Sequence, residues 1–151
     1  MDAADHDANV ISMGFGSSAS SEFERDATLS AYSLDCILVA ASGNRADFPR
    51  YVQLELVALG VNILSTVPWN DYANDSGTSM ATLHVAGVAA LLKSRAERWP
   101  EEPLATEPWC HLNNSQIRKI LRLTAEDIGT TIFEELGAIV LNLNRRKPYF
   151  I

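Results

Sequence analysis

The chain has 151 residues, of which 47% are hydrophobic, and its 12 Lys and Arg against 19 Asp and Glu give a formal net charge of −7. This length predicts one globular domain over residues 1–151. Nucleic acid is not an expected partner, because phosphate backbones are bound by clustered cations and the one basic run, 145–147, is short. A membrane is not an expected partner either, because no apolar run approaches the roughly 18 residues of a spanning helix.

The sequence gives no signal of a metal site or of export. Cys36 and Cys110 allow at most one internal disulfide, and their spacing fits no zinc pattern. Residues 1–5 have neither the basic start nor the apolar stretch of a signal peptide. We therefore expect no bound metal, and the residues themselves leave the cellular compartment open.

Short apolar runs that alternate with helical stretches indicate an α/β fold with a mostly parallel sheet. The run at 36–41 is continuously apolar, as in a strand that is covered on both faces. In chain order, we expect a strand over 10–13, a helix over 23–33, a strand over 36–41, a strand over 57–65 interrupted at Gly60, a polar turn over 69–77, a helix over 79–98 and a helix over 113–129.

Two of these helices carry the clearest patterns. The helix over 79–98 is apolar on every side in its first half and contains small residues such as Gly87, which predicts burial in the middle of the domain. The helix over 113–129 begins with Asn113 and Gln116 at the spacing of a capping box, and its apolar residues recur at helical spacing. We expect this second helix to cover the sheet with its apolar face.

The segment 74–87 is the most informative for chemistry. A Gly-Thr-Ser turn at 77–79 leads directly into the helix and places the hydroxyl of Ser79 at the helix N-terminus. Unpaired backbone N–H groups there favour developing negative charge, which suits a nucleophile. The simpler alternative is that Thr78 or Ser79 acts only as the helix N-cap.

Three segments together resemble one protein family. Residues 77–87, GTSMATLHVAG, are very similar to the nucleophile segment of the subtilisin-like serine proteases, or subtilases. Residues 40–44, AASGN, resemble the family's strand that ends in an oxyanion-binding asparagine, and residues 10–16, VISMGFG, resemble the strand whose end lines the substrate pocket. Residues 56–61 and 113–129 also resemble family segments, so the resemblance covers nearly the whole chain in the right order.

The resemblance implies a three-layer subtilisin-like α/β fold, incomplete in this chain, and serine endopeptidase chemistry on peptide or protein substrates without a cofactor. Ser79 would be the nucleophile, and the side chain of Asn44 would donate to the oxyanion together with the backbone N–H of Ser79. The family is largely secreted. The substrate-binding residues implied by the matched segments are Gly14, Phe15, Gly16, Ala41, Ser42 and Gly43.

The general base is not among the matched residues. In subtilases an Asp and then a His precede the serine in chain order, and the resemblance begins after both, so we expect this chain alone to be inactive. The remaining histidines are poor substitutes: we expect His6 to be solvated and His84 to fill a polar niche beside the sheet, and His111 gives no signal. A partner that carries the missing amino-terminal half is one expectation.

The chain also departs from the family elsewhere. Leu59 and Leu83 stand where the family usually has proline, and Gly14 stands where it has serine. The interval between Asn44 and Ser79 is too short for the family's further strand pair, which predicts packing that differs from the family's. Two alternatives to a truncated protease follow: a catalytically inactive relative that binds peptides or proteins, and a fragment produced by a gene model.

Overall fold

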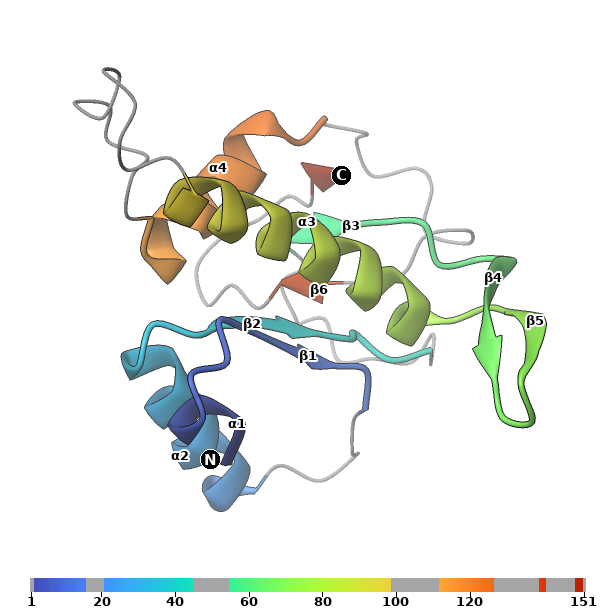
Figure 1. Cartoon of the computed structure of the whole chain (residues 1–151), viewed down its shortest axis with the longest axis horizontal. Helices are drawn as coiled ribbons and strands as arrows, with labels where there is room; N and C mark the ends of the chain where they lie inside the picture. Colours follow the sequence, from blue (N-terminus) through green and yellow to red (C-terminus); the bar gives the residue numbers. More distant parts are fainter. Residues whose placement is uncertain are drawn as a thin grey trace.

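A sheet lies between two layers of helices in the computed structural model, which describes residues 2–15, 21–44, 55–98, 112–126, 139–140 and 149–150. Helices α3 and α4 lie on one side of the strands β1 and β2, and α1 and α2 lie on the other (Figure 1). The elements are α1 (Asp2–Asp5), β1 (Val10–Met13), α2 (Glu22–Ser33), β2 (Ile37–Ala40), β3 (Leu56–Val57), β4 (Ile63–Val67), β5 (Asp71–Asp75), α3 (Thr78–Arg98), α4 (Asn114–Thr124), β6 (Ile139–Val140) and β7 (Tyr149–Phe150).

The central strands confirm the predicted βαβ unit. Strand β1 pairs with β2 in parallel, from Val10 opposite Ile37 to Met13 opposite Ala40, and α2 makes the crossover between them. On its other side β2 pairs with β6 in the antiparallel direction, so the described strand order is β1–β2–β6. A parallel pair, β3 with β7, and an antiparallel pair, β4 with β5, complete the described pairings. Strand β1 is therefore an edge strand within the described part of the chain.

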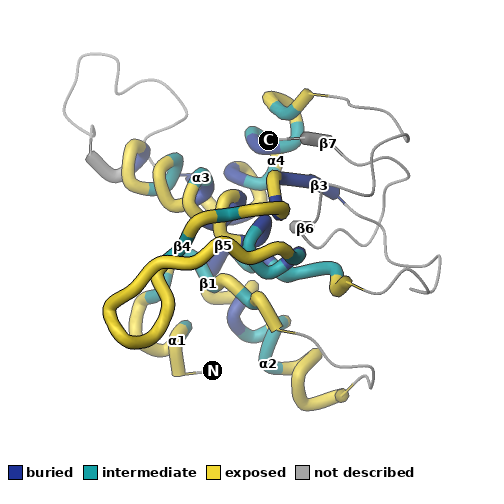
Figure 2. Tube along the Cα trace, turned by 90° about the vertical axis from the view of Figure 1, so that its right-hand side faces the viewer, coloured by how far each residue is buried: buried dark blue, intermediate teal, exposed yellow. Residues whose placement is uncertain are grey.

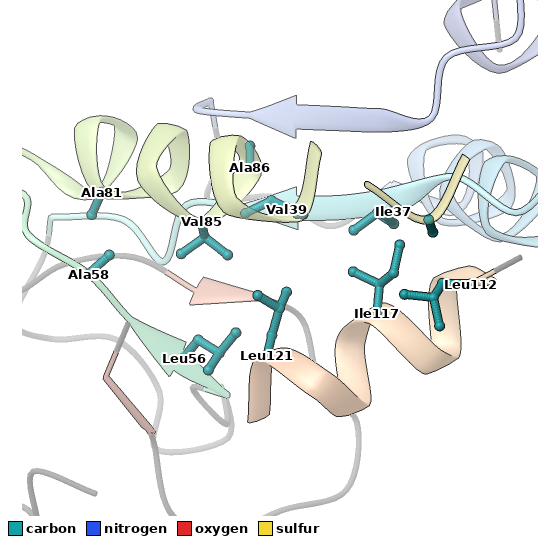
Figure 3. Close-up of a cluster of buried hydrophobic side chains, with 12 residues drawn as sticks. Ile37, Val39, Leu56, Ala58, Ala81, Val85, Ala86, Leu112, Ile117 and Leu121 are labelled. Carbon is teal, nitrogen blue, oxygen red and sulfur yellow. The ribbon is translucent and has the colours of Figure 1, made fainter. Parts of the chain in front are cut away.

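The core lies between β2, β3 and the inner faces of α3 and α4. Val39, Leu56, Val85 and Ile117 are each 0% exposed, and their side chains meet between the sheet and the two helices (Figure 3). Removing such side chains from water at about 25 cal/mol per Å² is the main stabilising contribution to a fold of this kind. Helix α3, which carries Ser79 in its first turn, packs against the sheet through this cluster.

Helix α4 is held to the rest of the molecule at its N-terminus. The Asn113 side chain accepts the backbone N–H of Gln116, and the Gln116 side chain accepts the N–H of Asn113, which confirms the predicted capping box. The carboxylate of Asp35, just before β2, accepts the N–H of Asn114 at 2.7 Å. The helix ends at Thr124, whereas the predicted stop at Gly129 lies outside the described residues.

A buried ion pair joins α4 to the segment before β3. The side chain of Glu55 is 1% exposed, and its two carboxylate oxygens lie 2.7 Å from Nε of Arg118 and 3.0 Å from Nε of Arg122. A carboxylate buried in this way is tolerated because two guanidinium groups compensate its charge. Nothing in the local sequence around Glu55 predicts this arrangement, because the two arginines are more than sixty positions away.

The prediction for residues 57–77 is right in part. The expected interruption at Gly60 lies between β3 and β4, but the two pieces belong to different sheets. The expected polar turn over 69–77 is wrong, because it contains a strand, β5, that pairs with β4 along its whole length. Trp69 and Asn70 both have positive φ, 74° and 61°, which makes a tight turn that brings β4 and β5 into register. The resulting hairpin projects from the body of the molecule (Figures 1 and 2).

The expectation that α3 is buried on every side is also wrong. Leu83 is 57% exposed and Leu91 is 72% exposed, and a Cβ added at Gly87 between them would meet no atom within 4 Å. His84 is likewise exposed and fills no polar niche beside the sheet. The sheet and α4 cover one face of α3, and among the described residues nothing covers the other (Figure 2).

Within the described part of the chain, no helix combines the length and the apolar character that a bilayer crossing requires.

Candidate active site

The ends of β1 and β2 meet the start of α3 at one edge of the sheet. Gly14 follows β1, Asn44 lies four positions after the end of β2, and Thr78 and Ser79 open α3. Because β1 and β2 are parallel, their carboxyl ends lie at the same edge, which is where α/β folds bind ligands. Three segments that are distant in sequence therefore bring functional groups together.

The hydroxyl of Ser79 is held by the end of β1. Its Oγ donates to the carbonyl oxygen of Gly14 at 2.6 Å. A Cβ built on Gly14 would lie 3.3 Å from Cβ of Ser79, which is tighter than most such contacts. Glycine at position 14 thus lets the strand end approach the serine closely, and the serine that the family usually has there would crowd this contact.

The side chain of Asn44 binds the first residue of α3. Its Oδ1 accepts the backbone N–H of Thr78 at 2.9 Å and the hydroxyl of Thr78 at 3.0 Å. The amide nitrogen of Asn44 then lies toward Gly77, where an added Cβ would be 3.0 Å from Nδ2. Asn44 is exposed and lies at the same end of α3 as Ser79.

These contacts bear on the alternative in which a hydroxyl merely caps α3. The acceptor for the N–H of Thr78 is Oδ1 of Asn44, a residue from a different segment. The hydroxyl of Thr78 donates to that same oxygen, and the hydroxyl of Ser79 donates to Gly14. Among the described residues, neither hydroxyl accepts an N–H of its own helix, so Ser79 does not act as the N-cap.

The other residues expected to bind substrate are placed around this edge. The N–H of Ala41 donates to the carbonyl of Met13 at 3.0 Å, and the N–H of Gly43 donates to the Thr78 hydroxyl at 3.1 Å. Gly43 has a φ of 89°, a conformation that favours glycine. Ser42 lies between them and is partly exposed, and Phe15 is 74% exposed beyond β1. Gly16 lies outside the described residues.

A general base for Ser79 is not provided by the described histidines. His6 is 76% exposed, as expected, and its Nδ1 lies 2.7 Å from the carbonyl oxygen of Asp2 in α1. His84 is exposed further along α3, and His111 lies outside the described residues. In the described part of the chain the recorded partner of the Ser79 hydroxyl is a backbone carbonyl, which cannot take its proton.

Metal-ligating side chains do not gather at this edge or elsewhere in the described ranges. Cys36, a free and buried thiol before β2, donates to the carbonyl of Ala8 at 3.0 Å. Burial raises the pKa of this thiol, the Asp35 carboxylate raises it further, and Lys93 acts in the opposite direction. The thiol is therefore kept protonated and belongs to the packing of the sheet. Cys110 lies outside the described residues.

The role of Thr78 at this site could not be deduced from the local sequence. Its hydroxyl binds both Gly43 and Asn44, each of which lies more than thirty positions earlier in the chain. A threonine next to a candidate nucleophile is also common at the start of an ordinary helix. The family motif contains this threonine but does not indicate which residues its side chain binds. The same is true of Gly14, whose carbonyl becomes the partner of Ser79 only when β1 is placed beside α3.

Comparisons with known proteins identify the family to which this chain belongs. The model of the family described as "Subtilase family" matches residues 46–138. The alkaline elastase YaB of Bacillus sp. (strain YaB) is 36% identical, over 85% of this chain and 38% of its own length. Subtilisin BL of Lederbergia lenta is 35% identical, over 85% of this chain and 53% of its own length.

A solved structure shows the same fold. The structure of the patellamide maturation protease PatA superposes with a TM-score of 0.68 at 24% identity, covering 89% of this chain and 58% of that one. The chain thus spans about half, or less, of the length of these relatives. The layered α/β arrangement and the predicted resemblance are both confirmed. The chain belongs to the subtilase family of serine proteases.

Proposed function

We propose that residues 1–151 form part of a subtilase catalytic domain and carry its nucleophile and its oxyanion site. In this reaction Oγ of Ser79 attacks the carbonyl carbon of a peptide bond, the amine leaves with a proton, and water then releases the acyl group from Ser79. The amide of Asn44 and the backbone N–H of Ser79 donate to the oxyanion of each tetrahedral intermediate. No cofactor is needed for these steps.

The observation that supports this most strongly is the meeting of Gly14, Asn44 and Ser79. A hydroxyl that lies 2.6 Å from the carbonyl oxygen of Gly14, beside the side-chain amide of Asn44 at the start of a helix, supports a nucleophile and an oxyanion donor at one site. Gly14, Phe15 and Gly16 would form one wall of the substrate site, and Ala41, Ser42 and Gly43 the other. A peptide or protein chain lying between these two strand ends is the proposed substrate.

The proton acceptor is proposed to come from an amino-terminal subtilase half, which supplies an Asp and a His. Two features support a missing neighbour. Strand β1 is an edge strand within the described residues, and the outer face of α3 leaves Leu83 and Leu91 uncovered. Without that half, the hydroxyl of Ser79 donates to a carbonyl, and we propose that residues 1–151 alone are inactive.

Hydrolysis of a chromogenic peptide tests the proposal. The amino-terminal part of Subtilisin BL is joined to this chain through a flexible linker, which keeps the two parts at an effective concentration of about millimolar. We expect the fusion to hydrolyse the peptide, and we expect no hydrolysis by residues 1–151 alone. Ser79→Ala should abolish the activity, whereas Ser94→Ala, an exposed position on the same helix, should leave it unchanged. A fusion that is folded but inactive would contradict the proposal.

A second candidate is an inactive relative that binds peptides, and the carbonyl partner of the Ser79 hydroxyl favours it. It predicts that a fluorescent peptide binds to the chain with an affinity that Ser79→Ala does not change, and that the fusion does not cleave that peptide. Cleavage by the fusion would exclude this candidate.

A further inference from the structure

One edge of strand β5 is unpaired within the described part of the chain. Strands β4 and β5 form a two-stranded sheet, from Ile63 opposite Asp75 to Val67 opposite Asp71. All five residues of β5 are exposed, and the hairpin projects from the body of the molecule (Figure 2). An unpaired edge offers its backbone N–H and C=O groups to a further strand.

Two carboxylates lie along this free edge. Oδ1 of Asp71 accepts the backbone N–H of Tyr72 at 2.8 Å, and Oδ1 of Asp75 accepts the N–H of Ser76 at 2.7 Å. In an antiparallel pair, alternate residues direct their backbone groups toward the partner strand and away from it. The N–H groups of Tyr72 and Ser76 bind neighbouring side chains instead of β4, so residues 72, 74 and 76 direct theirs to the free edge. The two carboxylates therefore lie at that edge.

Large apolar side chains are exposed on the same hairpin. Tyr72 of β5 is 67% exposed and Leu64 of β4 is 66% exposed. They share one face of the hairpin, because Leu64 lies opposite Asn74, two positions from Tyr72. Asp71 and Asp75 belong to the other face, since side chains alternate along a strand. A strand added at the free edge would thus meet apolar surface on one face and negative charge on the other.

The turn of the hairpin adds an exposed aromatic side chain. Trp69 is 97% exposed and has a φ of 74°, a conformation that bulky residues rarely adopt. The turn therefore accepts backbone strain while it holds an indole in solvent. Strained residues of this kind cluster at functional sites, and aromatic side chains are enriched in protein interfaces. Both properties of Trp69 support a binding surface on this hairpin.

The charge of β5 decides which strand can pair with it. A second copy of β5, in antiparallel pairing centred on Ala73, would place its own Asp75 opposite Asp71. Like charges directly opposite each other on a sheet are destabilising. Residues 61–76 contain no Lys or Arg, and the whole chain has a net charge of −7. The edge is therefore complementary to a strand with basic side chains and not to a second copy of itself.

We propose that the free edge of β5 binds an extended segment of another protein that carries Lys or Arg at two positions four residues apart. In antiparallel pairing these two side chains lie opposite Asp71 and Asp75, and a β-branched residue between them lies opposite Tyr72 on the other face. The carboxylates turn from the N–H groups of residues 72 and 76 to the basic side chains, and carbonyl oxygens of the bound segment accept those N–H groups.

This division of roles gives both affinity and selectivity. Backbone hydrogen bonds of an added strand supply affinity whatever its sequence, and its side chains supply specificity. Asp71 and Asp75 repel an acidic strand and attract a basic one, so the same two groups act against the wrong partner and for the right one. The surface lies outside the acyl-transfer site at Ser79, and its binding does not require catalysis.

Peptide binding to the full chain tests the proposal without any activity. Three fluorescent β-hairpin peptides differ only in their outer strand, and fluorescence anisotropy measures their binding at low ionic strength. The strand Lys-Thr-Thr-Val-Lys is expected to bind. Thr-Lys-Val-Lys-Thr has the same composition but places its lysines on the other face, and it should bind at least several-fold more weakly. The strand Asp-Tyr-Ala-Asn-Asp, which copies β5, should not bind.

Variants of the hairpin locate the bound peptide. The double variant Asp71→Asn and Asp75→Asn should raise the Kd of the first peptide roughly fivefold, because exposed charge pairs contribute modestly. Asp26→Asn, an exposed position on α2, is the matched control and should leave the Kd unchanged. Asn74→Pro removes an N–H of the free edge but not one that binds β4, so it should abolish binding.

The other outcomes overturn the proposal. Equal binding of the two lysine peptides would show attraction to net charge without strand pairing, and binding of the β5 copy would make a second copy of this chain the occupant. No binding of any peptide, or a double variant that behaves like Asp26→Asn, would also overturn it. If Asn74→Pro does not fold, the backbone ¹⁵N–¹H resonances of the unmodified chain replace it: the first peptide should shift those of residues 72, 74 and 76, and unchanged resonances there would contradict pairing at this edge.

Discussion

Apolar side chains lie on both faces of α3, in opposite environments. On the inner face Val85 and Ala89 are 0% exposed against the sheet and α4, whereas on the outer face Leu83 and Leu91 are more than half exposed. Figure 2 shows both conditions along one helix. Whether a helix face is buried thus depends on which other elements pack against it. An apolar sequence pattern alone does not predict which elements these are.

The exposed outer face of α3 also bears on how residues 1–151 behave in solution. Exposed leucines on a central helix, together with an edge strand, favour association with other apolar surfaces. The chain spans about half of the length of Subtilisin BL. We expect residues 1–151 alone to be marginally stable or to self-associate.

The largest expected effect comes from introducing a charge on the inner face of α3. Val85→Asp would bury a carboxylate without a partner, and we expect the cooperative urea transition to be lost. Leu83→Asp is the matched control on the outer face, where solvent reaches the carboxylate, and it should change the free energy of unfolding by less than about 0.5 kcal/mol. Circular dichroism follows the urea transition in both variants. A similar loss of the transition in Val85→Asp and Leu83→Asp would show that the outer face is covered too.

The next effect concerns the buried ion pair between α4 and Glu55, just before β3. Glu55→Gln leaves Arg118 and Arg122 without their buried counter-charge, and we expect a loss of about 3 kcal/mol in the free energy of unfolding. Glu22→Gln, at an exposed position of α2, is the control and should have almost no effect on the free energy of unfolding. An unchanged urea midpoint for Glu55→Gln would mean that this ion pair does not stabilise the packing of α4.

Changes to the outer face should alter association more than stability. The double variant Leu83→Gln and Leu91→Gln removes apolar surface from α3 without touching the inner core. Size-exclusion chromatography with light scattering should show self-association of the unmodified chain and a shift toward monomer in the variant. A monomeric unmodified chain with a cooperative melt above about 60 °C, beyond the usual mesophile range, would contradict the expectation.

The smallest effect is a pH dependence from Cys36. Burial raises the pKa of its thiol in the folded chain, so the unfolded chain releases this proton at a lower pH. The stabilisation is complete below the ordinary thiol pKa of about 8.5 and is lost as the pH rises through the folded value. Urea midpoints between pH 7 and pH 10 should fall slightly more for the unmodified chain than for Cys36→Ala. A parallel fall in both would show that Cys36 makes no contribution.

The sequence predicts those elements that local signals define. Strands β1 and β2, helices α2 and α3, and the capping box of α4 were all expected, because apolar runs and the Asn113–Gln116 spacing are local features. The candidate nucleophile and oxyanion donor came from the family motifs, and the structure brings Ser79 and Asn44 to the same end of α3.

The remaining features depend on contacts between distant segments. The β4–β5 hairpin turns at Trp69 and Asn70, which both adopt positive φ. Asparagine often adopts this conformation, but tryptophan rarely does, so the turn type could not be predicted from these residues. The pairing of Glu55 with α4 and the network around Thr78 join residues that are far apart in the chain. The exposure of Leu83 and Leu91 on the outer face of α3 depends on how the helix packs in the fold, which no local sequence pattern indicates.

The most direct test of the account is labelling of Ser79 with a fluorophosphonate probe, located by mass spectrometry of the labelled peptide. We predict no labelling of residues 1–151 alone, because a serine hydroxyl without a base is a weak nucleophile, and clear labelling of the fusion that includes the amino-terminal half. Robust labelling of residues 1–151 alone, abolished by Ser79→Ala, would contradict the account, since a residue of this chain would then act as the base.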